Sequence, residues 1–428
     1  TGNSAANSLV GNTGSNELDG ASGDDSLAGA SGDDSLHGGS GNDSLSGGNG
    51  TDLVSGGTGS DTLSGGTGDD TYHLDSSGDD ISGESSATSG GIDTVITSVD
   101  WSAARDYVEN IEAAAGTESI DLAGNQLANI LVGNGGENIL DGAAGADIMS
   151  GGKGNDTYYI DDAGDNISGE SSASGGGVDT VHSAIDWSAS GDYVENLRAA
   201  SGTAAIDLVG NQLANRLAGN DGANILNGRA GADWMAGGNG NDKYVIDNTA
   251  DNISGESSAS AGGVDTVLSS VTWSMRSDYT EKLTLTGADN VNATGNKLAN
   301  VIVGNAGANT LAGAAGADLL TGGAGADKFA YAAASESTLG ALDRITDFTR
   351  GSDKLDLSQL DGNAATSGHQ DFAFIGSRAF SANATGQLRF ALESGKVMLY
   401  GSTDADGAAE FAVQISGPAM LAASDLLI

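Results

Sequence analysis

Aspartate recurs with a period of nine residues along much of this chain. In six successive nine-residue units of its N-terminal part the sixth residue is Asp, namely Asp25, Asp34, Asp43, Asp52, Asp61 and Asp70. Carboxylates, together with backbone carbonyls freed by glycine-rich turns, offer the six or more hard oxygen ligands that calcium prefers. Asp and Gly are also common in plain turns, but a turn role would not require Asp in one phase over six units. The aspartates therefore predict a row of Ca²⁺ sites.

The nine-residue unit predicts the structure that positions these carboxylates. Eight consecutive units run from Gly2 to His73, and the best copies read GGSGNDSLS and GGTGSDTLS, with an apolar residue always eighth. Six glycine-rich residues can turn tightly, and three residues around one apolar side chain form a short strand, so two units predict one coil of 18 residues. Stacked coils predict an all-β parallel β-roll, or β-solenoid, with a thin apolar core between two sheets.

The consensus unit resembles the nonapeptide of the repeats-in-toxin (RTX) family. The resemblance implies that each ion is held by carbonyls of the second and fourth residues of one unit and of the first and third residues of the unit one coil later. For the pair of Asp43 and Asp61, the implied carbonyls are those of Gly39, Gly41, Gly56 and Thr58. For the other pairs of this array they include Gly23, Gly32, Gly38, Ser40, Gly47, Gly48, Asn49, Gly50, Gly65 and Thr67. Ala21 and Ala30 stand at the second position, and we expect them to distort their loops.

Three shorter arrays follow, from Gly124 to Tyr159, Gly210 to Val245, and Gly295 to Ala330. Their aspartate units carry Asp147, Asp156, Asp233, Asp242, Asp318 and Asp327. Extending the phase by one unit past each array adds four candidates, Asp79, Asp165, Asp251 and Glu336, as partners of Asp61, Asp147, Asp233 and Asp318. Glutamates of a recurring ISGE sequence are candidates to cap the last loop of an array: Glu84, Glu170 and Glu256. Each array opens with two units that carry Asn sixth, whose neutral turns are expected to stack their amides.

Segments of about 50 residues separate the arrays and repeat as well, each with a DTV sequence at Asp93, Asp179 or Asp265. Their β-branched, partly alternating pattern predicts longer strands that extend the solenoid. The predicted divisions are 1–80 (array 1), 81–123, 124–166 (array 2), 167–209, 210–252 (array 3), 253–294, 295–336 (array 4) and 337–428 (C-terminal cap).

The last segment resembles the C-terminal region of serralysin-type metalloproteases and of other type I secretion substrates. The resemblance covers this whole segment. It implies that DRITDF, Asp343 to Phe348, closes the roll and that the terminal Asp425 to Ile428 belongs to an uncleaved export signal. A plain β cap over the open end of the solenoid is the alternative, and both descriptions can hold together. Asp404 and Asp406 suggest a helix-loop-helix calcium loop, but the flanking sequence favours a hairpin turn.

Composition excludes several function classes. The 16 Lys and Arg against 59 Asp and Glu give a formal charge of −43, which argues against nucleic-acid and anionic-membrane partners and favours a cation. No apolar stretch approaches a membrane span. The four histidines are scattered, cysteine is absent, and there is no His-Glu-x-x-His or Gly-x-Ser-x-Gly sequence, so we expect no enzyme activity.

These observations predict a calcium-binding extracellular structural protein that folds on calcium after secretion. A surface-layer, filament or matrix component would have copies of itself as partners, and the type I secretion machinery would be its partner during export. Two alternatives stay open: the noncatalytic export and folding region of a secreted hydrolase, such as a protease or polysaccharide epimerase, and an adhesin stalk.

Overall fold

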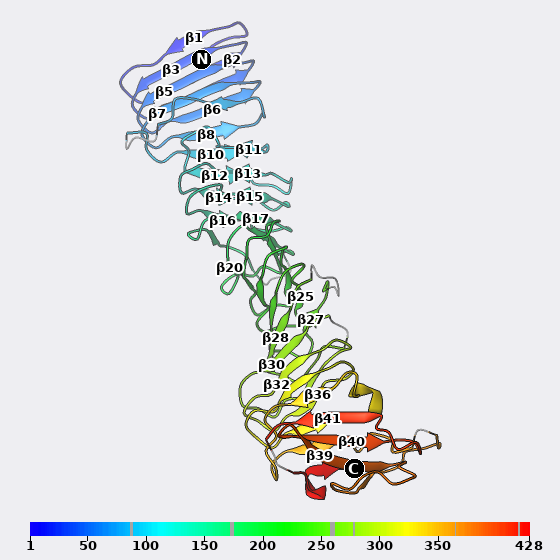
Figure 1. Cartoon of the computed structure of the whole chain (residues 1–428). Coiled ribbons are helices and arrows are strands. Elements are labelled where there is room, and N and C mark those ends of the chain that lie inside the picture. The colour runs from blue at the N-terminus through cyan, green and yellow to red at the C-terminus, as the bar shows by residue number, and fades with distance from the viewer. Residues whose placement is uncertain (86–88, 172–174, 257–261, 277–278, 364, 418–419) are drawn as a thin grey trace. The chain divides into compact units, whose positions relative to one another are not determined.

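The computed structural model describes residues 1–85, 89–171, 175–256, 262–276, 279–363, 365–417 and 420–428. These residues form an all-β parallel β-solenoid, as the nine-residue period predicts (Figure 1). The chain divides into two compact units, Thr1–Ala200 and Ser201–Ile428. No helix in the described residues is long and apolar enough to cross a membrane.

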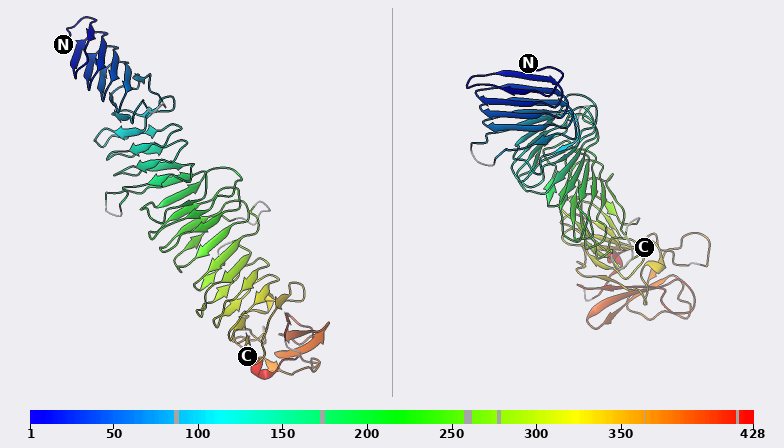
Figure 2. Two further views of the ribbon diagram at one scale, coloured as in Figure 1. Left: turned by 90° about the vertical axis from the view of Figure 1, so that its left-hand side faces the viewer. Right: turned by 90° about the horizontal axis from the view of Figure 1, so that it is seen from above.

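Two parallel sheets form the first array, and their strands lie stacked in Figure 2. One sheet has the order β1 (Ser8–Val10), β3 (Ser26–Ser31), β5 (Ser44–Asn49), β7 (Thr62–Thr67) and β9 (Asp80–Ile81). The other begins with β2 (Glu17–Ser22), β4 (Ser35–Ser40), β6 (Leu53–Thr58) and β8 (Thr71–Leu74). Leu27 pairs with Leu45 and Leu45 with Leu63, so one coil takes two nine-residue units.

The segment between arrays 1 and 2 continues the solenoid as predicted, but the prediction of longer strands was wrong, because its strands have two to four residues. The second sheet goes on through β10 (Thr94–Thr97), β12 (Asn110–Ala113), β14 (Ile130–Val132), β16 (Ile148–Ser150) and β18 (Asn166–Ile167). A third sheet of this unit contains β11 (Trp101–Ser102), β13 (Leu122–Ala123), β15 (Ile139–Asp141), β17 (Thr157–Ile160), β19 (Thr180–Ser183) and β21 (Asn196–Ala199); β20 is Trp187–Ser188. Thr94 pairs with Thr71 on one side and with Asn110 on the other, so coil length varies here.

The second unit repeats this plan. One row contains β22 (Leu208–Val209), β24 (Ile225–Asn227), β26 (Lys243–Ile246), β28 (Thr266–Ser269), β30 (Lys282–Leu285), β32 (Val301–Val303), β34 (Leu319–Thr321) and β36 (Asp343–Ile345). Two other rows are β23 (Arg216–Ala218), β25 (Trp234–Ala236) and β27 (Asn252–Ile253), and β29 (Trp273–Ser274), β31 (Ala293–Thr294), β33 (Thr310–Ala312), β35 (Lys328–Ala330) and β37 (Lys354–Asp356).

A C-terminal cap covers the last coil of the second unit. Strands β39 (Gln387–Glu393), β40 (Lys396–Ser402) and β41 (Phe411–Ile415) are antiparallel, and β41 adds in parallel to β36; β38 is Ala373–Phe374. Strand β42 (Leu426–Leu427) adds to β37. The cap also holds two short 3₁₀ helices, η1 (Ala334–Glu336) and η2 (Ala423–Asp425). Asp404 and Asp406 lie between β40 and β41, so the predicted hairpin is confirmed.

The core of the arrays is formed by the eighth-position side chains of the two facing sheets. Leu45, Leu63 and Tyr72 of the first array are buried, and Leu140, Tyr158 and Phe329 of later arrays take the same place. Alternation along each three-residue strand sends the flanking side chains outward, as in the buried-centre pattern of β16. The thin core fixes the coils in register, and this register places the sixth-position aspartates one above another.

Candidate metal sites

The sixth-position aspartates form ladders through hydrogen bonds between successive coils. In the first array, Oδ1 of each aspartate accepts the backbone N–H of the Asn or Asp one coil earlier. The N···O distances are 2.7 Å from Asp25 to Asp43 and from Asp43 to Asp61, 2.8 Å from Asp34 to Asp52 and 2.7 Å from Asp52 to Asp70. The structure thus brings together every pair predicted within this array.

The second oxygen of these carboxylates has no hydrogen-bond donor. In the described residues, Oδ2 is buried and without a partner in every aspartate unit: Asp25, Asp34, Asp43, Asp52, Asp61, Asp70, Asp147, Asp156, Asp233, Asp242, Asp318 and Asp327. A buried polar atom without a partner costs free energy unless the group takes up a proton or a cation lies beside it. Burial, followed by like charges on neighbouring coils, raises the pKa of Asp61 to about 6 and that of Asp70 to about 7.

Backbone oxygens converge on the same places, and glycine is what admits them. A Cβ on Gly38 would collide with Oδ2 of Asp43 and with the carbonyl oxygen of Gly56 one coil later. A Cβ on Gly41 would likewise collide with the carbonyl oxygen of Gly23. A carboxylate oxygen and a carbonyl oxygen therefore lie close together at this loop, and such oxygens suit a hard cation such as Ca²⁺. Of the carbonyls named from the sequence for Asp43 and Asp61, that of Gly56 lies here, whereas that of Thr58 accepts the N–H of Gly41 at 3.0 Å.

Asp units and Asn units have different loops. In the Asp units, the second and fourth residues have left-handed backbone, as at Gly39 (φ 112°) and Gly41 (φ 131°). In the Asn units of the described chain, neither position has positive φ, and the N–H of the second residue, Asn125, reaches Oδ1 of Asn129 at 2.8 Å. Nδ2 of Asn129 donates to the carbonyl of Val108 at 2.8 Å. An Asn loop is thus closed by its own hydrogen bonds, whereas an Asp loop leaves Oδ2 for a cation.

Two expectations about these loops were wrong. The Asn amides do not stack, because only two Asn units open each array and each Asn faces an aspartate one coil later: the N–H of Asn129 donates to Oδ1 of Asp147. Ala21 and Ala30 do not distort their loops, since they take the left-handed conformation themselves, with φ of 77° and 87°, and Ala21 keeps its register with Gly39. Cross-strand hydrogen bonds and the core hold these residues in a backbone that costs a non-glycine residue about 1–2 kcal/mol.

The candidates one unit past arrays 1 to 3 each end a row of hydrogen-bonded aspartates. The backbone N–H of Asp61 donates to Oδ1 of Asp79 at 3.1 Å. Asp165 and Asp251 accept the backbone N–H groups of Asp147 and Asp233 in the same way. Oδ2 of these closing residues accepts N–H groups of its own turn, as from Ser76 to Asp79 at 3.2 Å and in the turns of Asp165 and Asp251. Their carboxylates therefore differ from those inside the arrays.

Glu336 does not continue a ladder. The N–H of Asp318 donates to Asp343 at 2.8 Å, and Glu336 accepts the N–H of Ala332 instead. The insertion before β36 shifts the next coil by several residues, so a fixed step of 18 lands on the wrong acid. Asp353 accepts from Asp327 at 3.0 Å in the same way.

The aspartates that accept the N–H of the last aspartate in arrays 1 to 3 were not among the candidate ligands named from the sequence. We call each such hydrogen bond between aspartates of successive coils a rung. Asp93 accepts the N–H of Asp70 at 2.9 Å, and Asp179 and Asp265 accept those of Asp156 and Asp242 at 2.8 Å. Each rung spans 23 residues, and all three acceptors are buried. The recurring DTV sequence was the available signal, because a polar residue fixed at the start of three equivalent buried strands needs a partner.

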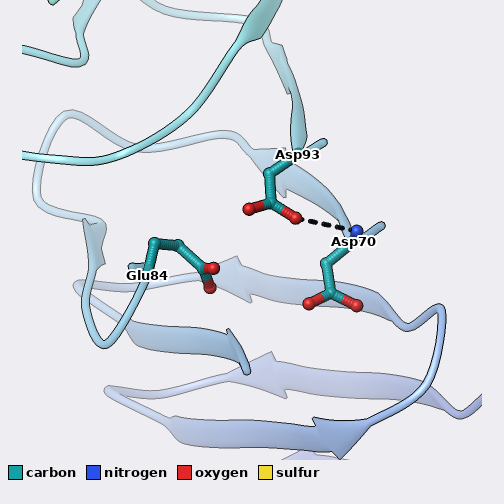
Figure 3. A group of neighbouring side chains, drawn as sticks. All are labelled: Asp70, Glu84 and Asp93. Carbon is teal, nitrogen blue, oxygen red and sulfur yellow. Dashed lines mark hydrogen bonds between the residues drawn. The ribbon is translucent and has the colours of Figure 1, made fainter. Parts of the chain in front are cut away.

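A glutamate joins each of these rungs. Oxygens of Asp70, Glu84 and Asp93 lie within 4.8 Å of one another, and the trios of Asp156, Glu170 and Asp179 and of Asp242, Glu256 and Asp265 repeat the arrangement (Figure 3 shows the first). Oε1 of Glu84 accepts the N–H of Gly65 at 3.1 Å, so the glutamate contacts the last loop of the array as the capping hypothesis supposed. Burial and the nearby Glu84 raise the pKa of Asp93 to about 8.

The fold and repeat define a β-roll protein of the RTX type. Residues 12–428 match the family described as peptidase M10 serralysin C terminal, so the chain belongs to that family. The family is that of the C-terminal repeat region and not of the protease domain. A search of curated proteins found no match to the chain. The family and the fold together indicate a calcium-binding RTX repeat protein.

Proposed function

We propose that this chain is an extracellular structural protein whose folding depends on calcium bound between its coils. The observation that carries the proposal is the buried Oδ2 without a donor in every aspartate unit. Twelve such buried carboxylates in one fold are stable together at neutral pH only when cations lie among them.

The protein's own cations do not neutralise these carboxylates. In the described part of the chain the ion pairs are Arg350 with Asp425 at 3.2 Å and His369 with Asp371 at 3.4 Å, and both lie in the C-terminal cap. The formal charge of −43 therefore falls largely on the solenoid and opposes its compaction. Calcium binding would supply the missing charge, and its binding free energy would appear as folding free energy.

This linkage makes location a folding signal. Calcium is scarce inside cells, where repulsion would keep the chain open for export through the type I secretion machinery. Outside, calcium at about 10⁻³ M would fill sites of the affinity found in extracellular modules, about 10⁻⁴ to 10⁻³ M. The same array aspartates would therefore keep the chain unfolded before export and drive its folding afterwards.

The role after folding is proposed as assembly with copies of itself, in a surface layer, filament or matrix. Regularity supports this role: outward-facing Ile130, Ile139 and Ile148 remain 43%, 40% and 44% exposed at successive units and present repeated apolar contacts. The family match favours a second candidate, a noncatalytic export and folding region attached to a secreted hydrolase.

Sedimentation velocity in calcium and in chelator separates the two roles. A protein that assembles with copies of itself would form large species as the calcium concentration rises. Magnesium at equal ionic strength would not replace calcium. A sharp monomer at every calcium concentration would contradict the assembly role and leave the export-region candidate.

A further inference from the structure

The three acidic trios differ from the array sites in how their glutamate is held. Oε1 of Glu84 takes the available donors: the N–H groups of Gly65 and Gly66, at 3.1 and 3.3 Å, and the hydroxyl of Tyr72. Oε2 is left buried and without a partner. The same oxygen is unpartnered in Glu170 and Glu256, whose Oε1 atoms accept from Tyr158 and Tyr244.

Each trio thus contains two unpartnered oxygens, one from the glutamate and one from the array aspartate. Asp70 is 1% exposed, and its Oδ2 lacks a donor, as do those of Asp156 and Asp242. In Figure 3 the carboxylate of Glu84 points from its loop toward the space that Asp70 and Asp93 border. The tyrosine and the loop N–H groups orient one oxygen of the glutamate and leave the other facing two further carboxylates.

We propose that Glu84, Glu170 and Glu256 each complete a calcium site of a second kind, built with the last aspartate of the array and the aspartate of the following DTV sequence. This inference rests on the proposed function and adds to it a separate set of ions at the array ends. Three carboxylates border each site, against two at an array site, and charge count is a main determinant of calcium affinity. These sites therefore fill at lower calcium than the array sites.

The fourth array provides an internal contrast. There the loop N–H groups of Gly322 and Gly323 donate to Asp347, one to each oxygen, at 2.9 and 2.8 Å, so neither oxygen is left free. Phe329 replaces the tyrosine, so the hydroxyl is missing as well. The array that runs into the C-terminal cap therefore closes without the second kind of site.

The sites would join each of the first three arrays to the segment that follows it. Asp70 and Asp93 are 23 residues apart, whereas aspartates of a regular coil are 18 residues apart, and Glu84 lies in the chain between them. An ion held by all three residues fixes both ends and the middle of this stretch of chain. The array-to-segment junctions would accordingly become ordered before the interior loops of the arrays.

Terbium provides a direct probe, because a lanthanide bound beside Glu84 lies close to the Tyr72 ring, which sensitises its luminescence. The experiment uses the full chain, the triple variant Glu84→Gln, Glu170→Gln, Glu256→Gln, and a control that removes three exposed carboxylates, Glu17→Gln, Glu112→Gln, Glu118→Gln. Bound calcium is counted after equilibrium dialysis, and tyrosine-sensitised terbium luminescence is titrated with calcium as competitor.

The triple variant is expected to lose three calcium ions and most of the sensitised luminescence, while the control keeps both. Circular dichroism in saturating calcium checks folding, and if the triple variant stays unfolded, Glu84→Gln alone tests the proposal by the loss of one ion. An unchanged ion count and luminescence in folded variants of a calcium-binding wild type would overturn this inference alone. A wild type that binds no calcium would overturn the proposed function with it.

Discussion

The substitution Asp61→Asn tests whether Asp61 acts as a metal ligand or only as a hydrogen-bonding residue of a turn. The amide keeps an oxygen that can accept the N–H of Asp43 and keeps the shape of the side chain, but it removes the charge at the buried, unpartnered Oδ2. Asp61 belongs to two pairs, with Asp43 and with Asp79, so one or two ions depend on it.

Linkage gives the size of the effect and its calcium dependence. With sites of about 10⁻⁴ M and calcium at about 10⁻² M, one ion contributes about 2.7 kcal/mol to the free energy of unfolding. That contribution falls by about 1.4 kcal/mol for each tenfold decrease in calcium, or by about twice as much if both ions are lost. Asp61→Asn should therefore destabilise the fold by an amount that grows with calcium.

Urea unfolding of the full chain, followed by circular dichroism at several calcium concentrations above the folding midpoint, measures this dependence. Asp80→Asn, an exposed neighbour on β9, is the matched control and should change stability little at any concentration. A loss of stability in Asp61→Asn that does not vary with calcium would refute the reasoning, because a hydrogen bond or turn preference has no such dependence.

Three further predictions concern protons, backbone and core. Burial raises the pKa of Asp61 to about 6 and that of Asp70 to about 7, against 3.8 in the unfolded chain, so bound protons stabilise the calcium-free fold below about pH 4 and this stabilisation is lost as the pH rises to about 7. Protons and calcium both favour the folded state, so the calcium midpoint of folding should be lower at pH 6 than at pH 8 in a fluorescence titration, and equal midpoints would contradict the raised pKa values. Ala143→Gly relieves a left-handed residue (φ 59°) and should raise the free energy of unfolding in urea by about 0.5 kcal/mol, whereas a decrease would show that the φ carries no strain. Leu140→Ala removes a fully buried core side chain and should lower the same quantity by about 2–5 kcal/mol, and a loss below about 1 kcal/mol would contradict a packed core.

The sequence predicts the regular part of the fold because one period controls both core and ladder. The apolar residue at the eighth position of each unit, such as Leu45 or Leu63, defines the strand. The Asp at the sixth position of each unit follows the same nine-residue period. Where the period breaks, the prediction fails: the rung from Asp70 passes over a loop to Asp93, and the rung from Asp318 goes to Asp343 instead of Glu336. Loop length carries no periodic signal, so register across an insertion depends on strand pairing.

The glutamates were predicted as caps, but their partners were not. Glu84 lies 19 residues from Gly65 and 12 from Tyr72, and neither spacing belongs to the nine-residue period. The left-handed alanines were misjudged for a related reason. Local preference disfavours the conformation of Ala21, but its pairing with Gly39 on the next coil imposes it.

A calcium titration followed by far-UV circular dichroism, with magnesium at matched ionic strength, tests the central claim most directly. The account predicts a disordered chain in chelator that converts cooperatively to β-structure in calcium at about 10⁻⁴ to 10⁻³ M, and no conversion in magnesium. A chain that already shows its full β-structure in chelator at neutral pH would contradict the account, because the buried carboxylates would then need no cation.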